Sequence, residues 1–181
     1  MVSLRSWSIL ALLAGSCAWA QQTNESGTLA ERFVRALELD EQAAMGLRAS
    51  ADKPRNDGKI NDDEFACIKR VNGADFMPVM TQIATAQLTA AEMQEAISFF
   101  ETPGGKKYLQ MSAVKSAERA GVKTELAMPD FTPKEYNAVN KFGTTKLYQK
   151  LINEAVMTRS AVARPLIQAR IMEIMQRCRS S

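Results

Sequence analysis

Apolar residues recur at three- and four-residue spacing along most of the chain, which is the period of an amphipathic helix. A first helix is expected over about residues 27–49, because its apolar positions fall on one face. Residues 51–59 are polar and contain Pro54 and Gly58, so a loop is expected there. Strand-like alternation is scarce. The pattern therefore predicts an all-α protein, a compact bundle of about six or seven helices.

Two further helices are marked by polar residues at their starts. Asn61, with Glu64 three residues later, is typical of a capped helix start. Gly73 is expected to end this helix and Asp75 to cap the next one. Pro78 then falls near the beginning of that next helix, where a missing N–H is tolerated.

The clearest local signal is a capping box with a hydrophobic staple. Thr89 is placed as the N-cap and Glu92 as the third helical residue, so each side chain can bond to the other's backbone N–H. Leu88 before the cap and Met93 after the box can close the staple. The pattern predicts a helix that starts sharply at this point.

A second helix follows this one after a very short turn. Thr102 is suited to cap it and Pro103 to occupy its first position. Gly104 and Gly105 would let the new helix approach its predecessor closely. Residues 88–121 are therefore predicted to form a tight helical hairpin.

The same design recurs 43 residues later, where Thr132 and Glu135 form a second capping box. Phe142 and the two threonines that follow it echo Phe100 and the Thr-Pro pair of the first turn. The second copy, residues 131–151, lacks the Pro-Gly-Gly and is degenerate. Two helical hairpins of similar design are expected, as an internal duplication would produce.

The end of the chain is predicted to be a basic helix over about residues 145–178, kinked or split at Pro165. Residues 141–181 carry eight basic and two acidic residues, whereas residues 21–64 carry six basic and ten acidic ones. The basic helix could face an anionic partner, or it could dock beside the acidic segment of its own fold, which we favour. Peripheral membrane contact through this helix is the alternative. Nucleic acid is not expected, because no aromatic residues are interleaved with these charges.

Residues 1–20 have the three parts of a secretory signal peptide in order. Arg5 gives a basic start, an apolar run follows, and residues 18–20 form an A-x-A cleavage site. We therefore expect export to the periplasm, with residues 21–181 as a single all-helical domain. Cys17 lies in a loose lipobox, so a lipoprotein acylated at this cysteine and anchored to the membrane is the alternative.

The cysteine and histidine counts restrict the available chemistry. Removal of the signal peptide leaves Cys67 and Cys178, and an oxidising compartment favours one disulfide between them over two buried thiols. The chain contains no histidine, which removes Ser-His and Cys-His nucleophiles and histidine metal ligands. Two cysteines are too few for a zinc site, so no metal and no cofactor are expected.

Several chemical motifs are incomplete. Asp57 and Glu64 fit the second half of a calcium-binding EF-hand loop, but Lys53 and Arg55 stand where the first carboxylates belong. Catalysis without histidine would need paired carboxylates or a serine–lysine pair. The candidates for such roles are Glu92, Glu95, Glu101, Ser112, Lys115 and Ser116. None comes with a supporting motif, so an enzyme is not expected.

The first hairpin carries the motif of a known family. Leu88-Thr89-x-x-Glu92, followed by Phe99-Phe100-Glu101-Thr102-Pro103-Gly104-Gly105-Lys106-Lys107, resembles the domain of unknown function 2059 family over residues 88–112. The resemblance implies a bacterial, exported, all-helical protein. Because the family has no established general activity, the resemblance supplies no catalytic residue.

These observations together predict a non-enzymatic periplasmic helical protein that acts by protein–protein interaction. Its partner would be an envelope protein or a secreted protein, such as a toxin that it neutralises. A cell-envelope-associated accessory protein, held by the basic C-terminal helix or by acylated Cys17, is the first alternative. A hydrolase using carboxylates or a serine–lysine pair is the second.

Overall fold

The computed structural model describes residues 29–120 and 124–180. The predicted signal peptide, residues 1–20, lies outside the described residues, and so does Cys17. All regular secondary structure in the described part of the chain is helical, which confirms the all-α prediction. No helix in that part is both long and apolar enough to cross a membrane.

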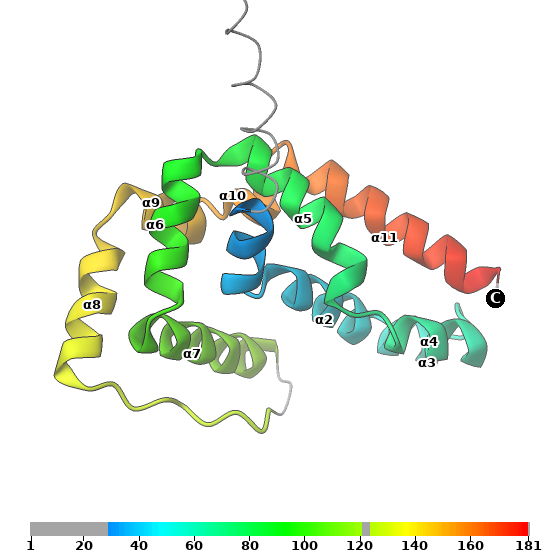
Figure 1. Cartoon of the computed structure of the whole chain (residues 1–181). Coiled ribbons are helices and arrows are strands. Elements are labelled where there is room, and N and C mark those ends of the chain that lie inside the picture. The colour runs from blue at the N-terminus through cyan, green and yellow to red at the C-terminus, as the bar shows by residue number, and fades with distance from the viewer. Residues whose placement is uncertain (1–28, 121–123, 181) are drawn as a thin grey trace, which may run out of the picture.

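The helices form two groups (Figure 1). A helix over residues 29–36 is followed by α2 (Leu39–Ser50), α3 (Asp52–Asn56), α4 (Asp62–Lys69), α5 (Gly73–Gln87), α6 (Ala90–Phe100), α7 (Pro103–Ala120), α8 (Pro133–Gly143), α9 (Lys146–Tyr148), the π-helical turn η1 (Gln149–Asn153), α10 (Val156–Arg159) and α11 (Ala163–Arg179). Helices α2 to α5 and α11 lie on one side of the molecule, and α6 to α8 lie on the other.

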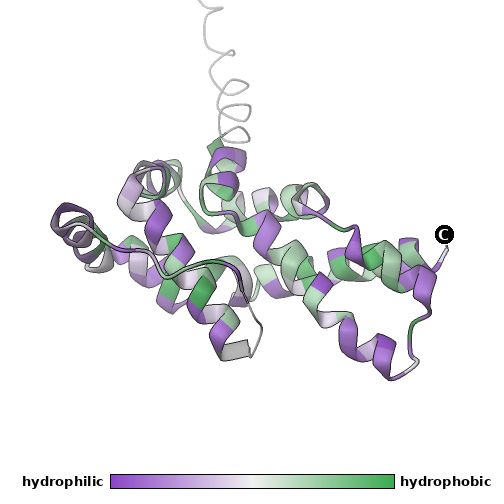
Figure 2. Ribbon diagram, turned by 90° about the horizontal axis from the view of Figure 1, so that it is seen from below, coloured by the Kyte–Doolittle hydropathy of each residue, from purple (hydrophilic) through white to green (hydrophobic). Residues whose placement is uncertain are grey.

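One cluster of buried apolar side chains connects the two groups. Phe33, Phe76 and Phe100 are among its largest fully buried members, and they come from three different helices. Hydrophobic and hydrophilic residues alternate along each helix in Figure 2, as expected for helices that bury one face. Helix α2 packs on α5, and α11 packs on α4 and α5. The core therefore holds the helices that carry the surfaces described below.

The prediction of one helix over residues 27–49 is wrong, because the chain turns at Glu38. The φ angle of Glu38 is 54°, in the left-handed region, and the helix cannot continue through it. The Gln42 side chain donates a hydrogen bond of 2.9 Å to the Leu37 carbonyl and so satisfies a group at the break.

The expected loop over residues 51–59 contains a short helix, α3. Pro54 is the third residue of α3, where its missing N–H has no helical partner to lose. Gly58 provides the turn after α3, with a φ of 67°. The prediction of a loop over all of residues 51–59 is therefore wrong, because Pro54 fits within the first turn of a helix and only the turn at Gly58 follows it.

Gly73 begins helix α5, so the prediction that it ends α4 is wrong. Asn72 is the N-cap, and Asp75 is the third helical residue of a capping box, so the expected cap at Asp75 was misplaced. A Cβ atom at Gly73 would lie 2.7 Å from Oδ2 of Asp40. The glycine thus permits the close packing of α5 on α2. Pro78 falls in the second turn of α5, beyond the first turn where its missing N–H has no effect.

The expected C-terminal helix over residues 145–178 is divided, but the break precedes Pro165. Ala155 adopts a left-handed conformation with a φ of 49°, and the Ser160 hydroxyl then accepts the backbone N–H of Ala163 at 3.0 Å. Pro165 is the third residue of α11, where proline is compatible with a straight helix. The proline therefore helps to start α11 and does not kink it.

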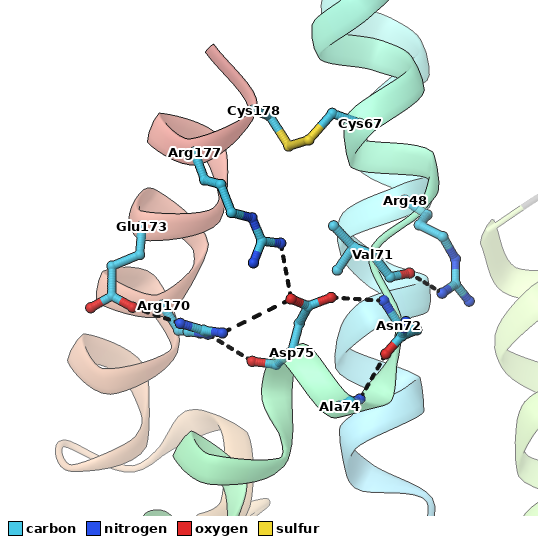
Figure 3. A network of polar contacts seen from close by, with 10 residues as sticks. All are labelled: Arg48, Cys67, Val71, Asn72, Ala74, Asp75, Arg170, Glu173, Arg177 and Cys178. Atoms are coloured by element: carbon cyan, nitrogen blue, oxygen red, sulfur yellow. Dashed lines mark hydrogen bonds and ion pairs between the residues drawn. A yellow bond between two sulfur atoms is a disulfide. The ribbon is translucent and has the colours of Figure 1, made fainter. Parts of the chain in front are cut away.

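Helix α11 is joined to the rest of the core by a disulfide and by a network around Asp75 (Figure 3). Cys67 of α4 is bonded to Cys178 of α11, as predicted. Nη2 of Arg177 lies 2.9 Å from Oδ1 of Asp75, and Nε of Arg170 donates to the Asp75 carbonyl at 2.6 Å.

The charge of Asp75 is expected to stabilise the fold at neutral pH. Burial acts to raise the pKa of Asp75, but hydrogen bonds from Arg177 and from the Asn72 backbone, with the charge of Arg170, hold that pKa below its usual value. A lowered pKa adds stability that is complete above the unfolded-state pKa of about 3.9 and is lost as the pH falls through the folded-state pKa.

Asp75→Asn should therefore lower the free energy of unfolding by about 2 kcal/mol at pH 7. The difference from wild type should shrink as the pH falls below about 4, because both proteins are then neutral at this position. Urea unfolding at several pH values measures both effects. Asp63→Asn is the control, since Asp63 is exposed and forms no ion pair among the described residues. A constant difference at all pH values would contradict the expectation.

Candidate functional site

A groove with a volume of about 640 Å³ lies between α6 and α8, beside the first turn of α7. Helices α6 and α8 stand next to each other at one end of the molecule in Figure 1. The groove is lined by Glu95, Ser98, Phe99, Thr102, Pro103, Gly104, Thr132, Lys134, Glu135, Ala138, Lys141, Phe142 and Thr145. Most of these residues belong to the two hairpins that the sequence predicts.

Local capping positions the α6 side of the groove. Thr89 accepts the Glu92 N–H at 3.2 Å, and the Glu92 carboxylate accepts the Thr89 N–H at 2.8 Å, so the expected capping box is present. At the other end of α6, the Thr102 hydroxyl donates to the Phe99 carbonyl at 2.6 Å and accepts the Gly105 N–H at 3.0 Å. These bonds end α6 and start α7 within one turn.

Only one of the two turn glycines lies against the preceding helix. A Cβ atom on Gly105 would stand 2.2 Å from the Phe99 carbonyl oxygen, so Gly105 allows α7 to begin directly against the end of α6. Gly104 instead faces α8, where its Cβ would lie 3.4 Å from the Glu135 carbonyl oxygen. Gly104 therefore brings the first hairpin close to the second one.

The second hairpin repeats these contacts at the same spacing. Thr132 and Glu135 form the expected capping box of α8. The Thr145 hydroxyl donates to the Phe142 carbonyl at 2.8 Å, as Thr102 does to Phe99. Each of these residues lies 43 positions after its counterpart, so Phe142 corresponds to Phe99 and not to Phe100.

The hydrophobic staple of the first hairpin is not repeated in the second hairpin. Leu88 and Met93 are both buried beside the first box, which is the arrangement that the sequence predicts. Tyr136, the counterpart of Met93, is 58% exposed. The start of α8 is therefore capped in the same way as the start of α6. Its fourth helical residue, Tyr136, is not a buried apolar side chain.

Two equivalent phenylalanines stack on one another at the base of the groove. The ring centroids of Phe99 and Phe142 lie 4.0 Å apart with an angle of 11° between the ring planes. Tyr108 and Tyr148 extend this aromatic cluster, and their hydroxyl oxygens lie 3.3 Å apart. Burial and the neighbouring Tyr148 raise the pKa of Tyr108. The base of the groove is thus the stacked pair Phe99 and Phe142, one ring from each hairpin.

Reciprocal ion pairs join the two hairpins. Nζ of Lys107 lies 2.7 Å from Oε2 of Glu135, and Nζ of Lys150 lies 2.8 Å from Oε1 of Glu92. Both the lysines and the glutamates are related by the 43-residue spacing. Such exchanged contacts, with equivalent rings meeting each other, are the pattern of two units related by an approximate two-fold axis.

The same contacts keep the two glutamates ionised. The hydrogen bond from Lys107 is the main cause that lowers the pKa of Glu135, and the Thr132 backbone adds to it. Burial acts to raise the pKa of Glu92, but hydrogen bonds from Lys150 and Thr89 outweigh it and lower that pKa. Both carboxylates are thus held as anions in the ion pairs between the hairpins, which does not suit either of them as a general acid.

The other residues considered for catalysis are not brought together. Glu95 is exposed at the groove, and Glu101 lies on another surface, 3.5 Å from Arg32. The serine–lysine candidates Ser112, Lys115 and Ser116 are exposed on α7 and do not line the groove.

The half EF-hand does not form a calcium loop. Helix α3 occupies its first four positions, residues 53–56, and the Asp57 carboxylate faces Lys59 at 3.2 Å and Lys53 at 3.8 Å. The described residues contain no group of three or more cysteine, aspartate or glutamate side chains that could hold a metal ion.

Three arginines of α11 form ion pairs with other helices of the protein. Arg170 and Arg177 face Asp75, and Nε of Arg179 lies 3.3 Å from Oε1 of Glu64. Glu64 belongs to the acidic segment, so the favoured expectation that the tail docks beside this segment is met at that position. A membrane surface would have to compete with these internal pairs for the same arginines.

The sequence patterns do not predict the groove or the ion pairs that join the two hairpins. The repeat spacing relates Glu92 and Lys107 to Glu135 and Lys150, but it does not indicate that each lysine pairs with the glutamate of the opposite hairpin. The groove forms where α6 and α8 become neighbours, and no local sequence pattern indicates that these two helices lie side by side.

These features define an all-α protein with two related helical hairpins that enclose a groove. Residues 74–130 match the family described as "Uncharacterized protein conserved in bacteria (DUF2059)", which confirms the resemblance found in the hairpin motif. The match spans α6 and α7 and ends before α8. No curated protein and no solved structure matched the chain.

Proposed function

We propose that the protein is an exported, non-enzymatic helical protein that acts by binding another protein, and that the groove between α6 and α8 is its contact surface. The observation that carries this proposal is the groove itself. It is open to solvent, its base is the stacked pair Phe99 and Phe142, and its walls are the outer faces of two helices. An apolar base with a few polar groups around it is typical of a binding site.

The arrangement supports binding more than catalysis. Glu135, which lines the groove, and its counterpart Glu92 are each held by a lysine of the opposite hairpin. The chain also has no histidine to act as a general base at neutral pH. Export is supported by the order of basic, apolar and cleavage-site residues in the first twenty positions.

Crosslinking in the cell tests the groove directly. A photoreactive residue at Ser98, which is exposed in the groove, should capture a discrete partner, and the same residue at Lys115 on α7 should not. Ala138→Arg should reduce the capture at least about tenfold, because the long arginine side chain then fills the space over the aromatic base, whatever the charge of the partner. Asn140→Arg is the matched control, since it adds the same charge to α8 at an exposed position outside the groove.

Equal capture with Ala138→Arg and Asn140→Arg would refute the groove as the contact surface. The intact mass of the same purified protein tests export. The expected mature chain begins at Gln21, and a chain that retains its first twenty residues would contradict export. A mass that indicates acylated Cys17 would favour the lipoprotein alternative.

A further inference from the structure

The two walls of the groove differ in charge although the hairpins that build them correspond. Helix α8 presents Lys134, Ala138 and Lys141 to the groove. The positions 43 residues earlier on α6 are Ala91, Glu95 and Ser98. The neutral residues Ala91 and Ser98 of α6 therefore correspond to Lys134 and Lys141 of α8. The acidic Glu95 of α6 corresponds to Ala138.

The fold does not need these two lysines. The α6 hairpin forms the same capping box and the same turn with Ala91 and Ser98 at the equivalent positions. Lys134 and Lys141 are exposed, and among the described residues neither has a carboxylate within ion-pair distance. By contrast, Lys107 and Lys150, which join the hairpins, are both paired. The charge of the α8 wall is therefore available to a ligand.

We infer that the groove takes an acidic amphipathic helix of a partner protein, with its carboxylates along the α8 wall and its apolar face on the aromatic base. This inference rests on the proposed function and names the class of partner. Lys134 and Lys141 lie seven residues apart on one helix, which corresponds to about 10.5 Å. Acidic residues seven apart on a helix lying along α8 repeat that distance. A small ligand with one anionic head group would reach only one of the two lysines.

The apolar part of the groove suits the other face of such a helix. Phe99, Phe142, Pro103 and Ala138 present rings and a methyl group, and the exposed carboxylate Glu95 lies on the opposite wall, on α6. An amphipathic helix places apolar side chains at positions i, i+3, i+4 and i+7, which can enter an apolar groove together. The partner helix would then bury its apolar stripe on the base and leave its acidic edge beside the lysines.

The test uses the full mature protein and a defined peptide. The probe is a covalently stapled helix of about fourteen residues, about 21 Å long, with a leucine stripe and glutamates seven apart on one edge. Fluorescence anisotropy should show saturable binding that weakens with added salt, because exposed charges are screened. A peptide with lysines in place of the glutamates should bind at least about fivefold more weakly.

The decisive variant replaces each lysine by its counterpart in the first hairpin, as Lys134→Ala with Lys141→Ser. We expect this double variant to bind the acidic peptide about fivefold to thirtyfold more weakly than wild type. The control is Lys53→Ala with Lys115→Ser, which removes two exposed charges outside the groove and should leave binding unchanged.

Equal binding of the acidic peptide by both double variants, or equal binding of the acidic and basic peptides by wild type, would overturn the inference. Those results can be told apart from failure of the proposed function. If Ala138→Arg still abolishes capture through Ser98, the groove binds a protein of other chemistry. If Ala138→Arg has no effect on capture, the groove is not the contact surface and both proposals fail.

Discussion

Removal of the Cys67–Cys178 disulfide is expected to lower the free energy of unfolding by about 4–5 kcal/mol, the largest effect that we expect from any change to this chain. The two cysteines are 111 residues apart, so the bond restricts a long loop of the unfolded chain. By the chain-entropy model, a loop of this length gives a stabilisation of that size. The bond also holds α11 against α4 in the folded state.

Urea unfolding of the oxidised protein, the reduced protein and the Cys67→Ala/Cys178→Ala variant measures this effect. Alanine is preferred to serine, because Cys178 is 2% exposed and a buried hydroxyl would add a cost of its own. The reduced protein and the double variant should agree within about 1 kcal/mol, since both lack the same crosslink. An unfolding midpoint that does not change on reduction would show that the crosslink contributes no stability.

Gly105→Ala is expected to destabilise the protein by about 3 kcal/mol or more. The added Cβ would lie 2.2 Å from the Phe99 carbonyl oxygen and 2.6 Å from the Phe100 Cα. Both are backbone atoms, so no side chain can rotate away, and α7 would have to move off the end of α6. That movement would also disturb the hydrogen bond between Gly105 and Thr102 that forms the turn.

Gly46→Ala is the matched control for this substitution. Gly46 lies inside α2, and a Cβ there would meet nothing within 4 Å. Alanine favours a helix interior over glycine by about 1 kcal/mol, so this variant should be more stable than wild type. Thermal or urea unfolding of the two variants should therefore give changes of opposite sign. Similar destabilisation by both would mean that close packing at Gly105 is not the cause.

The helix starts were predictable because capping is local. A capping box joins two residues three positions apart, and its residue types are visible in the sequence at Asn61, Thr89 and Thr132. The all-α class followed from the spacing of the apolar residues in the same way. These signals need no knowledge of the tertiary structure.

The helix breaks were harder to predict. Glu38 and Ala155 both adopt left-handed conformations that sequence patterns assign to glycine or asparagine, so neither residue marks a break. Gly73 was read as a local terminator, but its role is to admit Asp40 of another helix at close range. The start of α5 was visible locally, because Asn72 and Asp75 form a capping box around Gly73, whereas no residue type marks the breaks at Glu38 and Ala155.

The candidate site was only partly visible in the sequence. The motif residues at both ends of α6 were identified, and each has the expected capping role. The groove and its lysine wall were not identified, because they exist only where α6 and α8 become neighbours. The spacing between the copies would have indicated Lys150 as the counterpart of Lys107, but not that each lysine bonds the opposite hairpin.

The exchanged lysine–glutamate bonds have a consequence for the ancestry of the protein. A chain with only one hairpin could satisfy Lys107 and Glu92 in the same way only by associating with an identical chain. Fusion of two such genes would turn a concentration-dependent homodimer into a monomer whose halves meet at the high effective concentration of a short tether. After fusion the two halves could mutate separately, so the two walls of the groove could come to carry different charges.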